Sequence, residues 1–113
     1  MHELSIVMSI VDIATNQAEK ANAQTIDQIE LEIGELSGVE MNSFDFAWKQ
    51  GIRNSVLSKA ELVINRPAGK GLCMDCDTQF DMHRLFDACT QCGSHLVAVQ
   101  QGKELRVKSL LVS

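Results

Sequence analysis

The sequence predicts an α+β fold: two helices on a small three-stranded antiparallel sheet, with an inserted four-cysteine, zinc-ribbon-like module. Three observations support this. Apolar residues recur at helical spacing near the start of the chain, short strand-like stretches follow, and two Cys-x-x-Cys pairs stand twelve residues apart. We therefore expect residues 1–68 and 103–113 to form an α+β domain and residues 69–102 to form a metal-binding module.

The first predicted element is an amphipathic helix over residues 4–21. One apolar stripe has the spacing i, i+3, i+4, i+7 and consists of Leu4, Val7, Met8, Val11, Ala14 and Ala18. A second stripe consists of Ile6, Ile10 and Ile13. These stripes predict either a broad core face or a surface for a partner, and the core interpretation is favoured because even small domains bury wide helix faces.

A strand and a second helix follow. Residues 29–33 alternate between apolar and acidic side chains, as expected for a strand with one wet face, and Gly34 ends them. Ser37 and Glu40 have the spacing of a capping box, which predicts a helix with Ser37 as its N-cap. Its apolar face consists of Met41, Phe44, Ala47 and Trp48. Trp48 is interpreted as a core anchor.

The remaining strands are expected at residues 60–64 and 105–112. Pro67 closes the first of them, residues 67–71 form a short linker, and Gly102 makes the turn before the last strand. We expect these two strands to pair, with the metal module projecting from their connection.

The metal module is carried by Cys73, Cys76, Cys89 and Cys92. Two Cys-x-x-Cys pairs supply four thiolates, which suit a tetrahedral ion such as Zn²⁺ and close its coordination shell. The other candidate core residues of the module are few: Leu72, Phe80, Leu85, Phe86 and some aliphatics. A stretch this short should need its metal in order to fold. His83 and His95 are expected to be exposed and outside the ligand set.

Composition excludes several functions. The net charge of −5 and the absence of a basic cluster oppose nucleic-acid binding. No apolar run reaches membrane-spanning length, and the start of the chain lacks a signal-peptide pattern, so a cytoplasmic protein is expected. No catalytic constellation is recognisable, and the chain is predicted not to be an enzyme.

The N-terminus offers an unusual set of metal donors. The Met1 amine, the His2 amide nitrogen and the His2 imidazole can form fused chelate rings, and the amide or carboxylate of Glu3 can fill a fourth position. Such nitrogen-rich planar donors suit Ni²⁺ or Cu²⁺ rather than zinc. From the residues alone an idle terminus is the simpler interpretation, because chain ends are usually without a role.

The residues alone leave other classes open. A zinc ribbon that binds protein or nucleic acid, without any nickel role, is one. A rubredoxin-like electron carrier is another, because four cysteines also bind iron. A dithiol oxidoreductase is disfavoured, because the Cys-x-x-Cys motif is duplicated at metal-ligand spacing.

With these motifs assembled, the chain resembles the HypA/HybF family of hydrogenase maturation proteins, which are nickel metallochaperones. The resemblance rests on Met1–Leu4, on Leu31–Val39, on the two cysteine pairs and on Leu105–Ser109, in this order along nearly the whole chain. There are two modest departures: Asp77 stands where many relatives have Gly, and Thr90 where Pro is frequent.

The resemblance implies two metal sites. Nickel, the transferable cargo, is expected at Met1, His2 and Glu3, with Glu40 assisting, and structural zinc at the four cysteines. It also implies partners: the GTPase HypB, the large subunit of a nickel-iron hydrogenase and, for some members, urease maturation proteins. The chain itself is expected to be a monomer or a weak homodimer.

Overall fold

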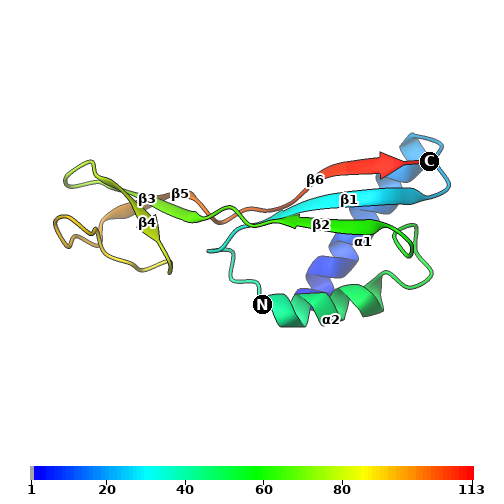
Figure 1. Cartoon of the computed structure of the whole chain (residues 1–113), viewed down its shortest axis with the longest axis horizontal. Coiled ribbons are helices and arrows are strands. Elements are labelled where there is room, and N and C mark those ends of the chain that lie inside the picture. The colour runs from blue at the N-terminus through cyan, green and yellow to red at the C-terminus, as the bar shows by residue number, and fades with distance from the viewer. Residues whose placement is uncertain (1) are drawn as a thin grey trace. The chain divides into compact units, whose positions relative to one another are not determined.

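The computed structural model describes residues 2–113, which form two helices and six strands (Figure 1). The elements are α1 (Glu3–Lys20), β1 (Ile26–Ile33), α2 (Met41–Gly51), β2 (Glu61–Asn65), β3 (Gly69–Cys73), β4 (Gln79–Met82), β5 (Val97–Gln101) and β6 (Leu105–Val112). They build two three-stranded sheets, with the strand orders β2-β1-β6 and β4-β3-β5. The predicted α+β class with its inserted cysteine module is confirmed.

The chain divides into two compact units. The first contains residues up to Leu31 together with Val39–Ile64 and Val107–Ser113, and the second contains Glu32–Gly38 and Asn65–Arg106. The segment 32–38 thus belongs with the cysteine-bearing unit, although it lies far from the cysteines in sequence. The functional division at residues 68/69 and 102/103 stays a prediction.

In the first unit, α1 and α2 lie on the same side of the β2-β1-β6 sheet (Figure 1). The face that α1 buries consists of Val7, Ile10, Val11, Ala14 and Ala18. Leu4, Met8 and Ile13, which the sequence analysis assigned to apolar stripes, are exposed. The buried face is therefore narrower than the apolar pattern suggests. Among the described helices none is long and apolar enough to cross a membrane.

Helix α2 begins at Met41, with Glu40 rather than Ser37 as its N-cap. The predicted cap was wrong because Gly38 has a φ of 82°, which turns the chain between Ser37 and the helix. The Glu40 carboxylate instead accepts hydrogen bonds from the backbone N–H groups of Asn42 and Ser43. Trp48 is buried, and its ring stacks on that of Phe44 with 6.0 Å between the ring centroids. Its predicted role as a core anchor is therefore confirmed.

The β2-β1-β6 sheet has β1 in its centre. Strands β2 and β6, which the sequence analysis expected to pair with one another, are therefore not neighbours. Side chains of β1 and β6 meet along the sheet: Glu32 pairs with Arg106, and Glu30 with Lys108. The acidic side chains that alternate along β1 thus pair with basic side chains of β6, in addition to facing solvent.

The second unit contains the antiparallel β4-β3-β5 sheet, in which β3 pairs with both of its neighbours. Strand β3 starts at Gly69, so the predicted linker over residues 67–71 was too long. The core of this unit consists of Leu36, Cys73, Phe80, Met82 and Cys89, with Val97 and Val99 packed against it. Phe80 is buried as expected. Leu85 and Phe86 are exposed, which corrects their assignment to the core.

Candidate metal centre

The four cysteines come from two backbone turns with the same hydrogen-bond pattern. Cys73 donates its N–H to Thr78 and accepts one from Asp77, while Cys89 donates to Ser94 and accepts from Gly93. Asp77 and Gly93 both have a positive φ, 60° and 75° respectively. Glycine adopts this conformation without strain and Asp tolerates it, so the departure at Asp77 leaves the turn intact.

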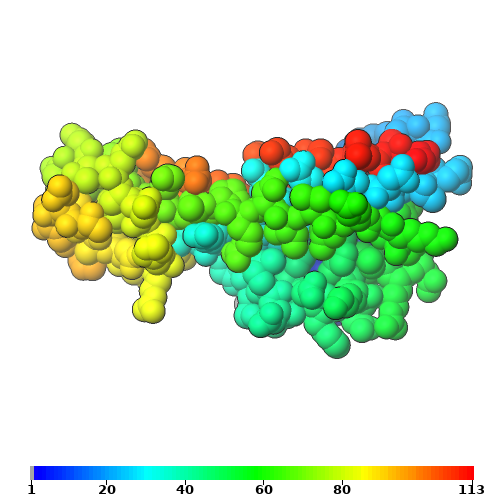
Figure 2. All heavy atoms as spheres, in the orientation of Figure 1, coloured from blue at the N-terminus to red at the C-terminus, as the bar shows by residue number. Residues whose placement is uncertain are grey.

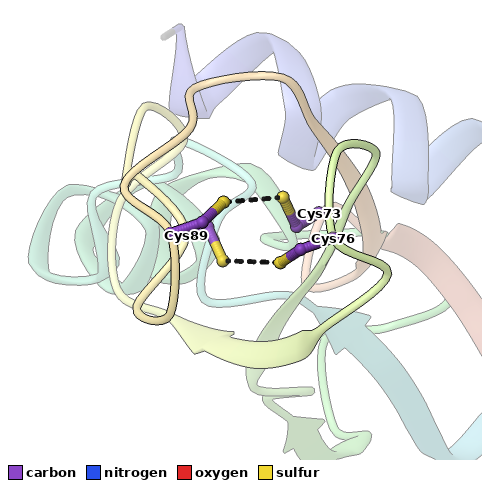
Figure 3. Close-up of side chains that lie close together, drawn as sticks. Cys73, Cys76 and Cys89 are labelled. Atoms are coloured by element: carbon purple, nitrogen blue, oxygen red, sulfur yellow. Dashed lines mark hydrogen bonds between the residues drawn. The ribbon is translucent and has the colours of Figure 1, made fainter.

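These turns bring the four sulfur atoms together, each within 4.8 Å of the others. Figure 3 shows the sulfurs of Cys73 and Cys76 facing those of the second pair. Cys73 Sγ lies 3.6 Å from Cys92 Sγ, and Cys76 Sγ lies 3.6 Å from Cys89 Sγ. A tetrahedron with Zn–S bonds of about 2.3 Å has edges of about 3.8 Å, whereas a disulfide is about 2.05 Å long. The cluster thus fits a tetrahedral ion and contains four free thiols.

The cluster has a buried side and a wet side. Cys73 and Cys89 lie in the apolar core of the second unit, while Cys76 and Cys92 are exposed. The N–H of Gln91 points at Cys89 Sγ at 3.4 Å, which supports a thiolate there. An ion bound at this site would therefore join the two turns to the core. Its ligand shell would be complete with four sulfurs, as is typical of structural zinc.

Two thiols of the cluster have shifted pKa values. The Thr78 hydroxyl, 3.1 Å from Cys76 Sγ, and the Thr78 backbone N–H lower the pKa of Cys76 to about 6. For Cys92, the Ser94 N–H lowers the pKa, but the neighbouring Cys73, Cys76 and Cys89 thiols and the partial desolvation of its sulfur raise it to about 12. Four sulfurs this close cannot all be thiolates without a cation among them. A divalent metal supplies that charge and releases the remaining protons.

His83 and His95 are exposed, as expected, and neither belongs to the sulfur cluster. Sequence reasoning missed Leu36, which lies in the same buried cluster as Cys73 and Cys89. A lone leucine between Gly34 and Gly38 carries no signal of this role. Its position depends on backbone contacts far along the chain: its N–H bonds the carbonyl of Gly102 at 2.7 Å.

Two of the three predicted nickel ligands, His2 and Glu3, lie at the start of α1. Met1 is outside the described residues. His2 is exposed and forms the N-cap of α1, and Glu3 occupies its first turn. Glu3 Oε2 accepts a hydrogen bond from the backbone N–H of Glu40 at 3.3 Å, so the structure brings these two acids together. Within residues 2–113, side-chain groups of three or more metal-binding residues occur only at the four cysteines.

Comparison with known proteins addresses the whole chain. The family model described as "Hydrogenase/urease nickel incorporation, metallochaperone, hypA" matches residues 1–112. A hydrogenase maturation factor HypA from Parabacteroides distasonis is 47% identical over 112 residues, covering 99% of this chain and 97% of the relative. The chain belongs to the HypA family. It is accordingly a nickel-incorporation metallochaperone of hydrogenase maturation and not an enzyme.

Other HypA relatives and solved structures agree over the same length. The factor from Prosthecochloris aestuarii is 38% identical over 110 residues and covers 97% of each chain. The solution structure of the nickel metallochaperone HypA from Helicobacter pylori has a TM-score of 0.71 at 31% identity, covering 99% of this chain and 97% of that one. The resemblance inferred from the sequence motifs is thus confirmed over essentially the whole chain.

Proposed function

We propose that this HypA-family chain binds Ni²⁺ at its N-terminus and delivers it to the large subunit of a nickel-iron hydrogenase. The ligands are the Met1 amine, the His2 amide nitrogen and imidazole, and either the amide or the carboxylate of Glu3. The observation that carries the proposal is the position of His2, exposed directly before the first turn of α1.

The start of a helix suits a chelate made partly of backbone nitrogens. The first N–H groups of an α-helix have no partner within the helix, because hydrogen bonding starts four residues later. Among residues 2–113 the first such bond runs from Ile6 N to His2 O at 3.2 Å. Deprotonation of the His2 and Glu3 amides by a bound metal would therefore break no helical hydrogen bond.

Glu40 is proposed to assist from the N-terminus of α2. Its backbone N–H bonds the Glu3 carboxylate, and its own carboxylate is held by Asn42 and Ser43. Two carboxylates near a chelate of neutral or singly negative donors would attract a divalent cation. The imidazole and the amine, as direct ligands, would then define the coordination geometry of the ion.

A carrier must also release its ion. An exposed chelate can open when its amine and imidazole are protonated, or when an acceptor replaces its ligands one at a time. The four-cysteine centre is proposed to hold Zn²⁺ as a structural ion, because two of its ligands are buried and its shell is closed. The two ions would then have separate roles: zinc maintains the second unit, and nickel is the cargo.

The proposed partners follow from that cargo. They are the GTPase HypB and the hydrogenase large subunit, with urease maturation proteins as further recipients. We place the exchange in the cytoplasm, where a reducing environment keeps four metal-binding thiols from oxidation. The chain is proposed to act as a monomer or a weak homodimer.

Nickel titration of the untagged protein tests this proposal, with wild type compared against His2→Ala. The variant should lose nickel binding and keep one zinc per chain and the wild-type circular dichroism spectrum. His95→Ala, which removes an exposed histidine outside both proposed sites, is the matched control and should bind nickel normally. Undiminished nickel binding by His2→Ala would refute the N-terminal site.

A further inference from the structure

The second unit carries an aromatic side chain that almost nothing covers. Phe86 is 89% exposed, and its neighbour Leu85 is 41% exposed. Both lie in the turn between β4 and the second cysteine pair. Figure 2 shows side chains from this part of the chain, coloured yellow, projecting from the surface of the unit. Scattered exposed leucines need no explanation, but a phenylalanine presented together with a leucine indicates a contact surface.

The turn that presents Phe86 is held rigidly by Asp87. Asp87 Oδ2 accepts the backbone N–H groups of His83 at 2.8 Å and of Arg84 at 3.1 Å. The N–H of Asp87 closes the turn on the Arg84 carbonyl at 3.2 Å. Presentation of Phe86 is therefore preorganised, and little conformational entropy would be lost when a partner covers it.

A groove of about 410 Å³ lies beside this turn. Its apolar lining consists of Leu85, Phe86, Val97 and Val99, and its polar lining includes His95 and Lys103. Val97 and Val99 belong to β5, an edge strand of the β4-β3-β5 sheet, and they pack against the buried cluster that contains Cys73 and Cys89. The groove is thus lined on one part by the Phe86 turn and on another by residues packed on the cysteine-bearing core.

The groove and its turn carry a net positive charge, whereas the chain as a whole has a negative net charge. The protein has a net charge of −5, whereas the turn and the groove carry two cations, Arg84 and Lys103. The anion among them, Asp87, accepts hydrogen bonds from two backbone N–H groups, which hold its pKa below the ordinary value and keep it ionised, so the two cations exceed the anions of this set by one. An acidic partner surface would therefore meet complementary charge here and repulsion over much of the remaining chain.

We propose that Phe86, Leu85 and the adjacent groove form the docking site for a partner protein that presents an apolar side chain flanked by carboxylates. The partner's apolar side chain fills the groove, Phe86 inserts into the partner, and Arg84 and Lys103 pair with the flanking carboxylates. The partner is one of the maturation proteins, so this inference rests on the proposed function. It assigns to the second unit a role in recognition, separate from nickel binding.

The chain offers a matched control for the test. Phe46 lies on α2 in the first unit and is 68% exposed, so Phe46→Ala removes a comparable surface aromatic elsewhere. Phe86→Ala and Arg84→Glu alter exposed side chains and should leave zinc content and thermal unfolding unchanged. Each variant is titrated by calorimetry against two probes in turn, the purified hydrogenase large-subunit precursor and the purified GTPase HypB.

We expect Phe86→Ala and Arg84→Glu to weaken binding of at least one probe tenfold or more, while Phe46→Ala binds it like wild type. Unchanged affinity of Phe86→Ala for both probes would overturn the docking site. So would sedimentation showing a wild-type dimer that Phe86→Ala dissociates, because the occupant would then be a second copy of the chain. Nickel titration of the same variants stays at wild-type values, so failure here is distinguishable from failure of the nickel site.

Discussion

The carboxylate of Glu3 accepts the backbone N–H of Glu40 at 3.3 Å, joining the first turn of α1 to the residue that caps α2. The two residues are 37 positions apart in sequence. Glu40 in turn uses both carboxylate oxygens on the amides of Asn42 and Ser43. Glu3, a proposed nickel ligand, thus contacts the backbone of the residue that caps α2.

Removal of the Glu40 side chain should destabilise α2. Glu40→Ala leaves the first amides of the helix without an acceptor, and we expect the melting temperature to fall by a few degrees (roughly 2–6 °C). Glu40→Asp is the control, because Asp is a favourable N-cap and should restore most of the loss. Thermal unfolding followed by circular dichroism measures the difference. An unchanged melting temperature for Glu40→Ala would show that the cap contributes nothing.

Extending the chain in front of Met1 should weaken nickel binding. A tag of two or three residues converts the Met1 amine into a peptide nitrogen, which is a poor ligand until it is deprotonated. We expect the nickel dissociation constant to rise by about tenfold or more, since loss of one metal–ligand bond on this scale costs at least about 1.4 kcal/mol. The same tag at the C-terminus, after Ser113, serves as the control. Equal affinities for the two tagged proteins would exclude the amine as a ligand.

Sequence periodicity located most elements because it reports which face of a helix or strand is buried. It placed β6 at its observed bounds, α1 to within one residue and the start of α2 to within three, and it placed Trp48 in the core. It missed β3, β4 and β5, because Gly69–Cys73 is rich in glycine, Gln79–Met82 is only four residues long and Val97–Gln101 has only two β-branched residues. None of these stretches has the sustained β-branched alternation by which strands are recognised.

In the candidate sites too, some residues could be predicted from the sequence and others could not. Cys-x-x-Cys spacing is local, so it identified the four sulfurs that the structure brings together. Leu36 and Thr78 act through contacts that spacing does not encode. Leu36 lies in the cysteine cluster, and its segment hydrogen-bonds the backbone at Gly102 and Glu104, far along the chain. Apolar character alone placed Phe86 in the core, whereas its exposure follows from the turn that Asp87 closes.

Removing the metal should unfold the second unit and spare the first. Two of the five residues in the core of the second unit are cysteine ligands, whereas the first unit has its own apolar core around Phe44 and Trp48. Because Trp48 is the only tryptophan, its fluorescence reports on the first unit. With a strong chelator we expect amide protection to be lost over β3–β5 while the emission maximum stays that of a buried indole.

Cys76→Ser serves as a second route to the same state, because it removes one ligand without adding a chelator. It should reproduce the loss of protection, and added zinc should reverse the chelator's effect but restore the variant poorly. Simultaneous exposure of Trp48 in either experiment would contradict independent stability of the first unit.

A side chain at position 34 should destabilise the protein, because Gly34 closely approaches the backbone of Gly102. A Cβ at Gly34 would lie 2.0 Å from the Gly102 carbonyl oxygen and 2.3 Å from its carbon, both of them backbone atoms. Since neither segment can move without breaking the bonds Gly34 N–Glu104 O and Leu36 N–Gly102 O, Gly34→Ala should lower the free energy of unfolding by about 2–3 kcal/mol. It should also loosen Leu36 from the cysteine cluster and lower zinc affinity.

Urea denaturation with elemental analysis checks this prediction. Glu35→Ala is the matched control: it changes the adjacent exposed residue, keeps the backbone bond from its N–H to the Pro67 carbonyl, and should stay within about 0.5 kcal/mol of wild type. The two substitutions lie at adjacent positions, but a Cβ at position 34 meets backbone atoms, whereas the side chain at position 35 is exposed. Equal denaturation midpoints for them would mean that the 34–102 approach relaxes freely, and that Leu36 is held on the cysteines by its own burial rather than by this backbone contact.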